Sequence, residues 1–263
     1  MTPATSDILV HTENGVLTLT FNREAKKNAI TAAMYQALAD ALNEAVSNPA
    51  VRVAVIQGSD ATFTAGNDLQ DFLDNARPIG RDGTDDPAPV EQFLHALRDF
   101  PKPLIAAVAG PAVGIGTTLL LHCDLVYAAD NAAFSLPFVN LGLCPEAGAS
   151  LLLPQMVGYL RAAEKLLLGE AFYADEALDM GLLNRIVPPG EVRAYAQAQA
   201  AKLAAKPLAS VLATKALLKR PQTALAGVMA DELRMFGDLL QGPASKEAIQ
   251  AVLEKRRPNF AGM

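Results

Sequence analysis

Two glycine-marked turns in the middle of the chain could bring complementary chemical groups to one site. The first is Gly110-Pro-Ala-Val-Gly-Ile-Gly-Thr-Thr118, and the second is Pro145-Glu-Ala-Gly148. If each turn opens a helix, the first can direct backbone N–H groups at a developing negative charge. The second then places a carboxylate, Glu146, near a helix start. An oxyanion site and one acid/base group are the minimum needed to move a proton next to a carbonyl.

A third glycine turn, Phe63-Thr-Ala-Gly-Asn-Asp-Leu69, follows a predicted buried strand at Val51–Gln57. A glycine there lets the backbone approach a ligand closely, and free N–H groups at a helix start favour an anion. If this turn is considered alone, an ordinary strand-to-helix connection explains the Phe63–Leu69 sequence better than a ligand site does. The Gly114-Ile115-Gly116 turn has the same two explanations, and together the two turns favour a two-donor oxyanion site.

Composition restricts the class of protein to a globular one. With 263 residues, 51% of them hydrophobic and 19% charged, the chain fits one large domain, or one domain with a helical extension. Alanine-rich helices and subunit interfaces would account for the high apolar content. The sequence has no apolar run of about 18 residues, so we expect no membrane segment.

Charge and cysteine content narrow the partners and the compartment. A net charge of −6 argues against nucleic acid as a partner. The first seven residues lack a signal-peptide pattern, which favours a cytoplasmic location. Cys123 and Cys144 provide neither a disulfide framework nor metal-ligand spacing, so we expect no metal. Cys144 is expected to be a small buried residue, and the three histidines to be structural.

Hydrophobic periodicity predicts an α/β core followed by helices. A hairpin over Ile8–Phe21 would turn at Asn14-Gly15. Thr31 would cap a helix reaching Ser47, with Met34, Leu38, Leu42 and Val46 on one face. Further buried strands are expected at Leu104–Ala109 and Leu125–Ala128, and a mobile loop or lid at 76–90. We also expect a helix that starts near Glu91 and ends before Pro101, a helix after Gly116, and an almost wholly helical region from about Arg161. We place a core domain at 1–195 and a helical oligomerisation region at 196–263.

Six stretches, in order along nearly the whole chain, resemble the crotonase (enoyl-CoA hydratase/isomerase) superfamily. The resemblance implies a spiral of ββα units, a helical trimerisation region, acyl-CoA thioester ligands and a homotrimer or hexamer. In that pattern the backbone N–H groups of Asn67 and Ile115 form the oxyanion hole. The stretches are Asn22-Arg23 through Asn28-Ala-Ile-Thr31, Ala65-Gly-Asn-Asp-Leu69, Gly110-Pro-Ala-Val-Gly114, Cys123-Asp-Leu-Val-Tyr-Ala-Ala129, Gly169 through Asn184, and Glu254-Lys-Arg-Arg-Pro258.

Departures from the hydratase pattern bear on the reaction. Enoyl-CoA hydratases carry two glutamates, at positions that are Thr118 and Phe138 in this sequence. Adding water across a double bond needs one carboxylate to activate the water and a partner to protonate Cα. A hydroxyl and a phenyl ring do neither at neutral pH. The sequence therefore disfavours hydratase chemistry.

Glu146 instead lies in Leu141-Gly-Leu-Cys-Pro-Glu-Ala-Gly148, which is similar to the stretch that holds the single catalytic base of peroxisomal-type Δ3,Δ2-enoyl-CoA isomerases. The resemblance implies an isomerase that moves a 3-enoyl double bond to the 2-trans position. A first-turn glutamate favoured by the helix dipole is the structural alternative. The functional alternatives are a hydratase or another crotonase-family enzyme, and a catalytically silent acyl-CoA-binding member.

The resemblance also assigns contacts with the substrate, and since CoA is part of that substrate we expect no separate cofactor. Arg23, Lys26 and Lys27 form a small basic cluster that would lie along the CoA nucleotide with Ala65. Solvated surface charge explains the lysines equally well. Lys255 could reach a CoA phosphate of a neighbouring subunit or end a solvated helix. The remaining predicted contacts are Ala29, Gly66, Asp68, Leu69, Gly114 and Phe138; Asp68 is more typical of a turn cap than of a catalytic group.

Overall fold

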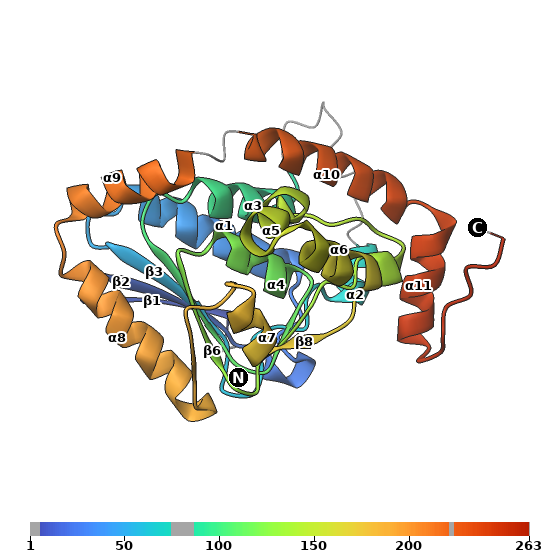
Figure 1. Ribbon diagram of the computed structural model, residues 1–263, viewed down its shortest axis with the longest axis horizontal. Helices are drawn as coiled ribbons and strands as arrows, with labels where there is room; N and C mark the ends of the chain where they lie inside the picture. The colour runs from blue at the N-terminus through green and yellow to red at the C-terminus, as the bar shows by residue number, and fades with distance from the viewer. Residues whose placement is uncertain (1–5, 75–86, 221–223, 263) are drawn as a thin grey trace, which may run out of the picture.

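A computed structural model describes residues 6–74, 87–220 and 224–262 (Figure 1). Its main sheet has the strand order β1-β2-β3-β4-β6-β9, and a small second sheet has the order β5-β7-β8. Only β1–β2 and β7–β8 are antiparallel. The strands are β1 Ile8–Glu13, β2 Val16–Phe21, β3 Val53–Gln57, β4 Leu104–Val108, β5 Pro111–Val113, β6 Leu125–Ala129, β7 Ala133–Ser135, β8 Phe172–Tyr173 and β9 Arg185–Val187.

The chain alternates between the two sheets, and this alternation builds the ββα spiral. After β4 it passes through Gly110 into β5, and after β6 it passes into β7. An isolated bridge between Thr64 and Ala112 places the segment after β3 beside β5 in the same way. Gly110 has φ +64°, and a Cβ there would lie 1.9 Å from the Ala61 carbonyl oxygen, so only glycine fits this corner. The predicted crotonase-type fold class is confirmed.

Helices cover both faces of the main sheet. Helices α1 (Ala32–Ser47) and α3 (Pro89–Asp99) pack together on one face, and α8 (Val192–Ala204) lies on the other. Consecutive strand residues alternate between these faces: Ala54 and Ile56 belong to the larger core, whereas Val53 and Val55 face α8. Both faces are therefore buried, as parallel sheets require.

The described elements at the start of the chain match the sequence-based predictions closely. Asn14 and Gly15 both have positive φ, which confirms the predicted hairpin turn. Thr31 caps α1, its Oγ1 accepting a hydrogen bond from the Met34 N–H at 3.3 Å. Val46 departs from the prediction, because it is 45% exposed. Residues spaced four apart drift around a helix of 3.6 residues per turn, so at the end of α1 the buried position is Ala45 instead.

The later part of the chain is helical but is interrupted by β8 and β9, which the prediction of almost continuous helix missed. The predicted helix after Gly116 is the single turn α4, which already begins at Ile115. Most of the predicted 76–90 loop lies outside the described residues, and Pro89 and Val90 already belong to α3. The remaining helices are α2 Leu69–Asp74, α4 Ile115–Thr118, α5 Ala149–Val157, α6 Tyr159–Leu168, α7 Ala174–Asp179, α9 Leu208–Lys219, α10 Leu225–Leu240 and α11 Pro243–Leu253, with short 3₁₀ turns η1 Glu24–Lys26, η2 Leu119–His122, η3 Val139–Leu141 and η4 Pro189–Glu191.

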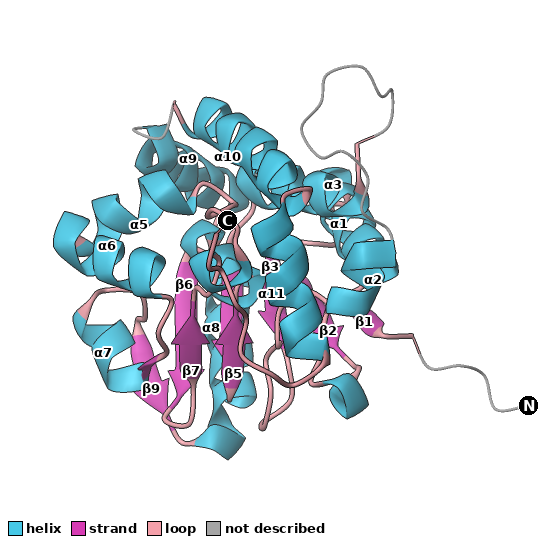
Figure 2. Ribbon diagram, turned by 90° about the vertical axis from the view of Figure 1, so that its right-hand side faces the viewer, coloured by secondary structure: helices cyan, strands magenta, loops and turns pink. Residues whose placement is uncertain are grey.

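Helix α11 lies beside β5 of the small sheet, on the side of the molecule that faces the viewer in Figure 2. It packs against η3 and α10, so the end of the chain returns to the middle segment that carries Glu146. The predicted boundary at residue 195 falls inside α8, and the division into two regions stays a prediction. Among the described residues, no helix is both long enough and apolar enough to cross a membrane.

Candidate active site

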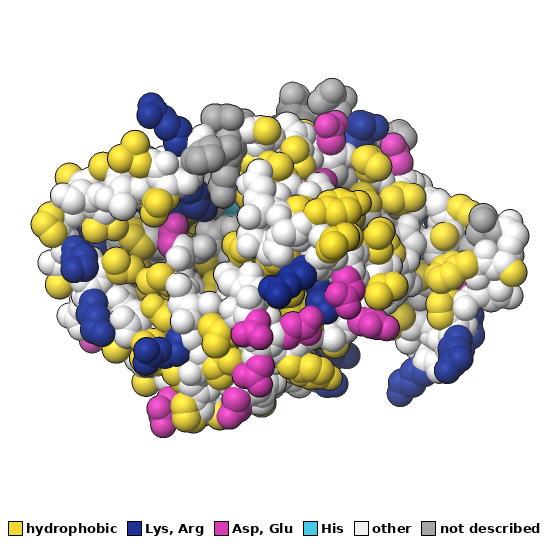
Figure 3. Space-filling view, in the orientation of Figure 1, with side chains coloured by type: hydrophobic (Ala, Val, Ile, Leu, Met, Phe, Trp, Pro, Cys, Tyr) yellow, Lys and Arg dark blue, Asp and Glu magenta, His cyan; other side chains and the backbone are white. Residues whose placement is uncertain are grey.

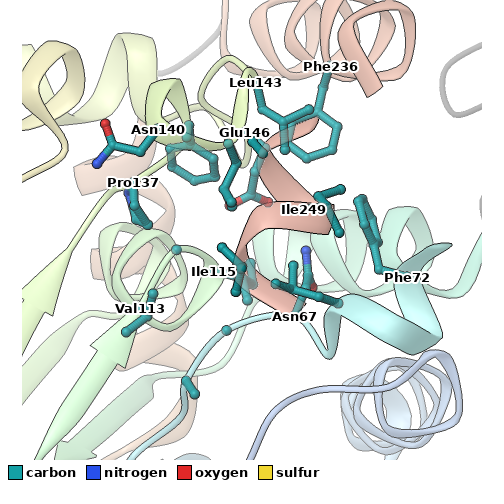
Figure 4. Close-up of a pocket in the computed structure, with 18 of the residues that line it drawn as sticks. Asn67, Phe72, Val113, Ile115, Pro137, Asn140, Leu143, Glu146, Phe236 and Ile249 are labelled. Atoms are coloured by element: carbon teal, nitrogen blue, oxygen red, sulfur yellow. The ribbon is translucent and has the colours of Figure 1, made fainter. Parts of the chain in front are cut away.

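A cavity of about 710 Å³ opens where four distant stretches of the chain meet. They are 65–72 around the start of α2, 113–115 at the start of α4, 137–146 around η3, and 236–260 from α10 to the tail (Figure 4). Eight of the predicted site residues line it: Ala65, Gly66, Asn67, Leu69, Gly114, Ile115, Phe138 and Glu146.

Glu146 is the carboxylate in the wall of this cavity. It is only 7% exposed and precedes α5 rather than lying within it, because Ala147 (φ +59°) and Gly148 (φ +72°) turn the chain before the helix starts. The Thr118 hydroxyl donates a hydrogen bond of 2.5 Å to its Oε1. That bond fixes the orientation of the carboxyl group on one side and leaves Oε2 for other partners.

Burial raises the pKa of Glu146 to about 8; the Thr118 hydrogen bond opposes this shift and a like charge on Glu232 adds to it. The helix-start effect that would lower the pKa is outweighed by loss of water around the carboxylate. A carboxyl group with a pKa near neutrality can both take up and release a proton under physiological conditions, which is the requirement for an acid/base shuttle.

The N–H groups of Asn67 and Ile115 belong to residues on the same cavity wall. Ile115 is the first residue of α4, so its N–H has no partner within the helix. At the bridge between Ile30 and Asn67, the hydrogen bonds use the flanking Gly66 carbonyl and Asp68 N–H instead. Neither the Asn67 nor the Ile115 N–H donates a hydrogen bond within the described part of the chain. Both donors remain available to a ligand oxygen.

Gly66 allows the backbone to reach this position. Its φ is +86°, and a Cβ at this residue would lie 2.8 Å from the Val113 carbonyl oxygen. The close approach joins the 65–72 stretch to the 113–115 stretch that carries Ile115. A side chain at position 66 would separate the two segments that hold the free N–H groups.

The two positions that hold glutamates in hydratases are also found at the site. Thr118 is fully buried, and its hydroxyl is used by Glu146. Phe138 lines the cavity. Neither side chain supplies a carboxylate, and among the described lining residues the only acidic group is that of Glu146.

Other predicted contacts lie beside the cavity rather than in its lining. The Arg23 guanidinium binds the Asp68 carboxylate at 2.8 Å and the Ala29 carbonyl at 2.9 Å. Burial alone would raise the pKa of Asp68, but the hydrogen bond from Arg23 and the backbone donors of the next turn lower it. Asp68 Oδ1 accepts from the Gln70 and Asp71 N–H groups, as the turn-cap interpretation expects.

The predicted lysine contacts are on the surface. Lys26 and Lys27 are exposed, and the Lys27 carbonyl accepts the Ala65 N–H at 3.0 Å, beside the cavity. Lys255 is exposed just after α11, between Val252 and Pro258, which both line the cavity. Lys27 and Lys255 are thus close, in space or in the chain, to lining residues without being among them.

Sequence reasoning missed several residues at the site. The Tyr35 hydroxyl donates to Asn67 Oδ1, and burial first, then the charge of Glu146, raises its pKa well above the ordinary value. Phe72 and Phe236 meet edge to face with ring centroids 6.1 Å apart. Leu143 and Ile249 complete the apolar wall around Glu146 (Figure 4). Of these residues, Tyr35 could have been noticed in the sequence, because its hydroxyl lies on the buried face of α1. The positions of the other four depend on tertiary contacts.

Comparison with known proteins gives the chain its family. Residues 11–263 match the family described as enoyl-CoA hydratase/isomerase. The 2,3-dehydroadipyl-CoA hydratase of Escherichia coli K12 is 36% identical over 98% of this chain and 99% of its own length. Enoyl-CoA delta isomerase 2 of Rattus norvegicus is 42% identical over 69% of this chain and 46% of its own.

Solved structures give the same result for the fold. The structure of Pseudomonas aeruginosa OdaA superposes with a TM-score of 0.89 and 46% identity, over 95% of this chain and 99% of that one. Relatives named as hydratases and relatives named as isomerases are thus both similar in sequence to this chain. The chain belongs to the enoyl-CoA hydratase/isomerase family, within the crotonase superfamily.

Proposed function

We propose that this enzyme moves the double bond of a 3-enoyl-CoA to the 2-trans position, with Glu146 as the single proton carrier. The observation that carries the proposal is the position of Glu146: a buried carboxyl group in the cavity wall, with Thr118 and Phe138 at the hydratase acid positions. Removing a proton next to a thioester carbonyl and returning it elsewhere on the same face requires only one such group.

The reaction follows from the geometry in two proton transfers. The C2 proton of a 3-enoyl thioester is acidified by the carbonyl and by the adjacent alkene. Ionised Glu146 takes this proton, and the electrons of the C–H bond form a dienolate whose oxygen is bound by the Asn67 and Ile115 N–H groups. Glu146 then gives its proton to C4, and the double bond is left between C2 and C3. Each oxyanion donor lowers the barrier by about 3–4 kcal/mol.

The CoA moiety is assigned to the edge of the cavity beside Ala65. Lys26 and Lys27, in the segment beside Ala65, and Lys255 near the lining residue Pro258 are exposed cations that would neutralise CoA phosphates. Arg23 would act indirectly, because its guanidinium already holds Asp68 and the Ala29 carbonyl. No cofactor beyond the CoA of the substrate is needed for this chemistry.

A hydratase is the competing enzyme activity, since the E. coli relative bears that name. It would need a second carboxylate beside Glu146 to activate water. A catalytically silent acyl-CoA-binding protein is the third alternative. It does not explain why a carboxylate, Glu146, is buried and oriented in the cavity wall.

The test is to incubate the purified protein with 3-enoyl-CoA and, separately, with 2-enoyl-CoA, and to identify the products by chromatography. Formation of 2-trans-enoyl-CoA from the first and little or no 3-hydroxyacyl-CoA from the second is expected. Fast hydration of the second substrate would overturn the proposal, and binding without turnover of either would favour the silent binder.

The rate should depend on pH through Glu146. Since only its ionised form can accept the C2 proton, and its pKa in the folded protein is about 8, kcat/KM should rise as pH increases and level off above about 8. Initial rates between pH 6 and 9.5, corrected for spontaneous thioester hydrolysis, measure this. A rate that does not change over this range, as a base with the ordinary glutamate pKa of 4.5 would give, would contradict the buried acid as the base.

We also propose that the chain assembles as a trimer or as a hexamer of two trimers. Large apolar side chains are exposed on α6 and α9, including Leu160 (81%), Leu167 (67%) and Leu218 (74%). Hydrophobic atoms are numerous over α9 and around α5 and α6 on the face shown in Figure 3. A solution mass equal to one chain at micromolar concentration, by light scattering, would contradict this.

A further inference from the structure

A second buried carboxylate lies behind the segment that carries Glu146. Glu232, on α10, is 6% exposed and is not among the residues that line the cavity. Its two oxygens accept three hydrogen bonds from the start of α5: from the Gly148 N–H at 2.6 Å, and from the N–H and hydroxyl of Ser150 at 2.9 and 2.5 Å. A protonated acid would turn one of these oxygens into a donor, so this arrangement fits a carboxylate.

The segment held by Glu232 has a backbone that needs restraint. Ala147 has φ +59°, a left-handed conformation that is unfavourable for a residue with a Cβ, and Gly148 follows with φ +72°. On the other side the buried His122 contacts the Ala147 carbonyl through Nε2 at 2.7 Å. Burial lowers the pKa of His122 to about 4, so the ring is neutral and Nε2 carries the donated hydrogen. Glu146 is therefore presented by a strained turn clamped between η2 and α10.

The charge of Glu232 also acts on Glu146. The ionisable groups near Glu146 are Tyr35 from α1, Cys144 from the same loop and Glu232 from α10. Tyr35 and Cys144 are neutral near pH 7, because burial raises the pKa of each. Glu232 is then the charge in this set that opposes ionisation of Glu146.

We propose that Glu232 is a positioning residue that acts through the Gly148–Ser150 backbone and fixes Glu146 in the cavity wall. Its negative charge then also favours the protonated form of Glu146, which makes the ionised carboxylate a stronger base. The inference rests on the proposed isomerase function, in which Glu146 both accepts and returns the proton. A base of higher proton affinity is better able to take the weakly acidic C2 proton, provided that it can still release it to C4.

The test compares Glu232→Gln with Asp231→Asn in the full-length protein. Both remove one negative charge from adjacent positions of α10, but the Asp231 side chain is 75% exposed and forms an ion pair with Arg234 at 3.6 Å. In E232Q we expect lower kcat and a pH midpoint moved down by roughly one unit, the usual size of such perturbations. D231N should keep the midpoint of the parent. Because E232Q removes the charge as well as the contacts, an unmoved midpoint in this variant would show that the Glu232 charge does not act on Glu146 and would overturn the proposal.

Two further variants keep the proposal testable if E232Q does not fold. Thr118→Val removes the hydrogen bond that favours ionised Glu146, so its midpoint should move upward, opposite to E232Q. Ser150→Ala removes one of the contacts to Glu232 but leaves its charge, so kcat should fall several-fold while KM and the midpoint stay unchanged. An unchanged kcat in S150A would refute the positioning role.

Failure of this inference can be separated from failure of the proposed function. Infrared difference spectra between the parent and E146Q report the Glu146 carboxyl band and its titration without any substrate. A lower titration midpoint in the E232Q background supports the inference even if 3-enoyl-CoA is not the substrate. An unchanged midpoint there refutes it whatever the reaction is.

Discussion

Replacing Glu146 by glutamine is expected to reduce isomerisation of 3-enoyl-CoA by roughly 10²-fold or more, while acyl-CoA binding is retained. Glutamine keeps the size of the side chain and can still accept the Thr118 hydrogen bond, but it cannot take a proton from C2. The loss should therefore appear in kcat rather than in KM. Single-turnover rates and equilibrium binding of a saturated acyl-CoA measure the two effects separately.

Glu170→Gln is the matched control for this variant, because Glu170 is an exposed glutamate outside the cavity lining. It should isomerise at the rate of the parent. Hydration of 2-enoyl-CoA should be very weak in the parent and in both variants, since no lining residue among those described supplies a second carboxylate. Full isomerase activity in E146Q would rule out Glu146 as the base.

Removing the Ile115 N–H should cost about 10²–10³-fold in kcat, the usual effect of deleting one oxyanion donor. Ile115→Pro does this with little damage to the backbone, because residue 115 is the first of α4 and its N–H makes no bond within the described residues. Proline is tolerated at the first position of a helix for that reason. The rate is measured with 3-enoyl-CoA after a melting curve has established that the variant is folded.

The partner variant Ile115→Ala separates the N–H from the side chain. It also loses the aliphatic side chain that lines the cavity but keeps the donor, so its kcat should fall far less than that of I115P. Equal losses in the two variants would assign the effect to packing and would remove Ile115 from the oxyanion hole.

Local sequence signals were enough where the structure depends on neighbouring residues. Asn14-Gly15 predicted a turn whose two positive φ angles the structure contains, and Thr31 predicted the cap of α1. The turns at Gly66 and Gly114 follow the adjacent parallel strands β3 and β4, and because the ends of such strands share an edge, the sequence could predict that Asn67 and Ile115 would meet. The turn with Glu146 follows β7 and η3 instead, so its place beside them depends on tertiary packing. All three residues line one cavity, although the catalytic roles given to them stay predictions.

Features that depend on distant contacts could not be predicted from the sequence. Strands β8 and β9 have two and three residues, too few to show a period of two, and they form by pairing with β7 and β6. In the sequence, Glu232 looks like an ordinary polar residue of an amphipathic helix. Only the tertiary structure shows that its carboxylate accepts hydrogen bonds from Gly148 and Ser150. The phenyl rings of Phe72 and Phe236 are far apart in the sequence, so their contact could not be predicted from it.

The burial of Glu146 has a consequence for how this sequence can change over time. In the unfolded chain its pKa is near 4.5 and in the folded protein it is about 8, so the contribution of this one group to stability is fully present below pH 4.5 and is lost as pH rises through about 8. At neutral pH a glutamine at this position should therefore give a higher melting temperature than the natural residue. A mutation of Glu146 to glutamine would therefore give a more stable but inactive protein, so selection for catalytic turnover is what keeps the glutamate at this position.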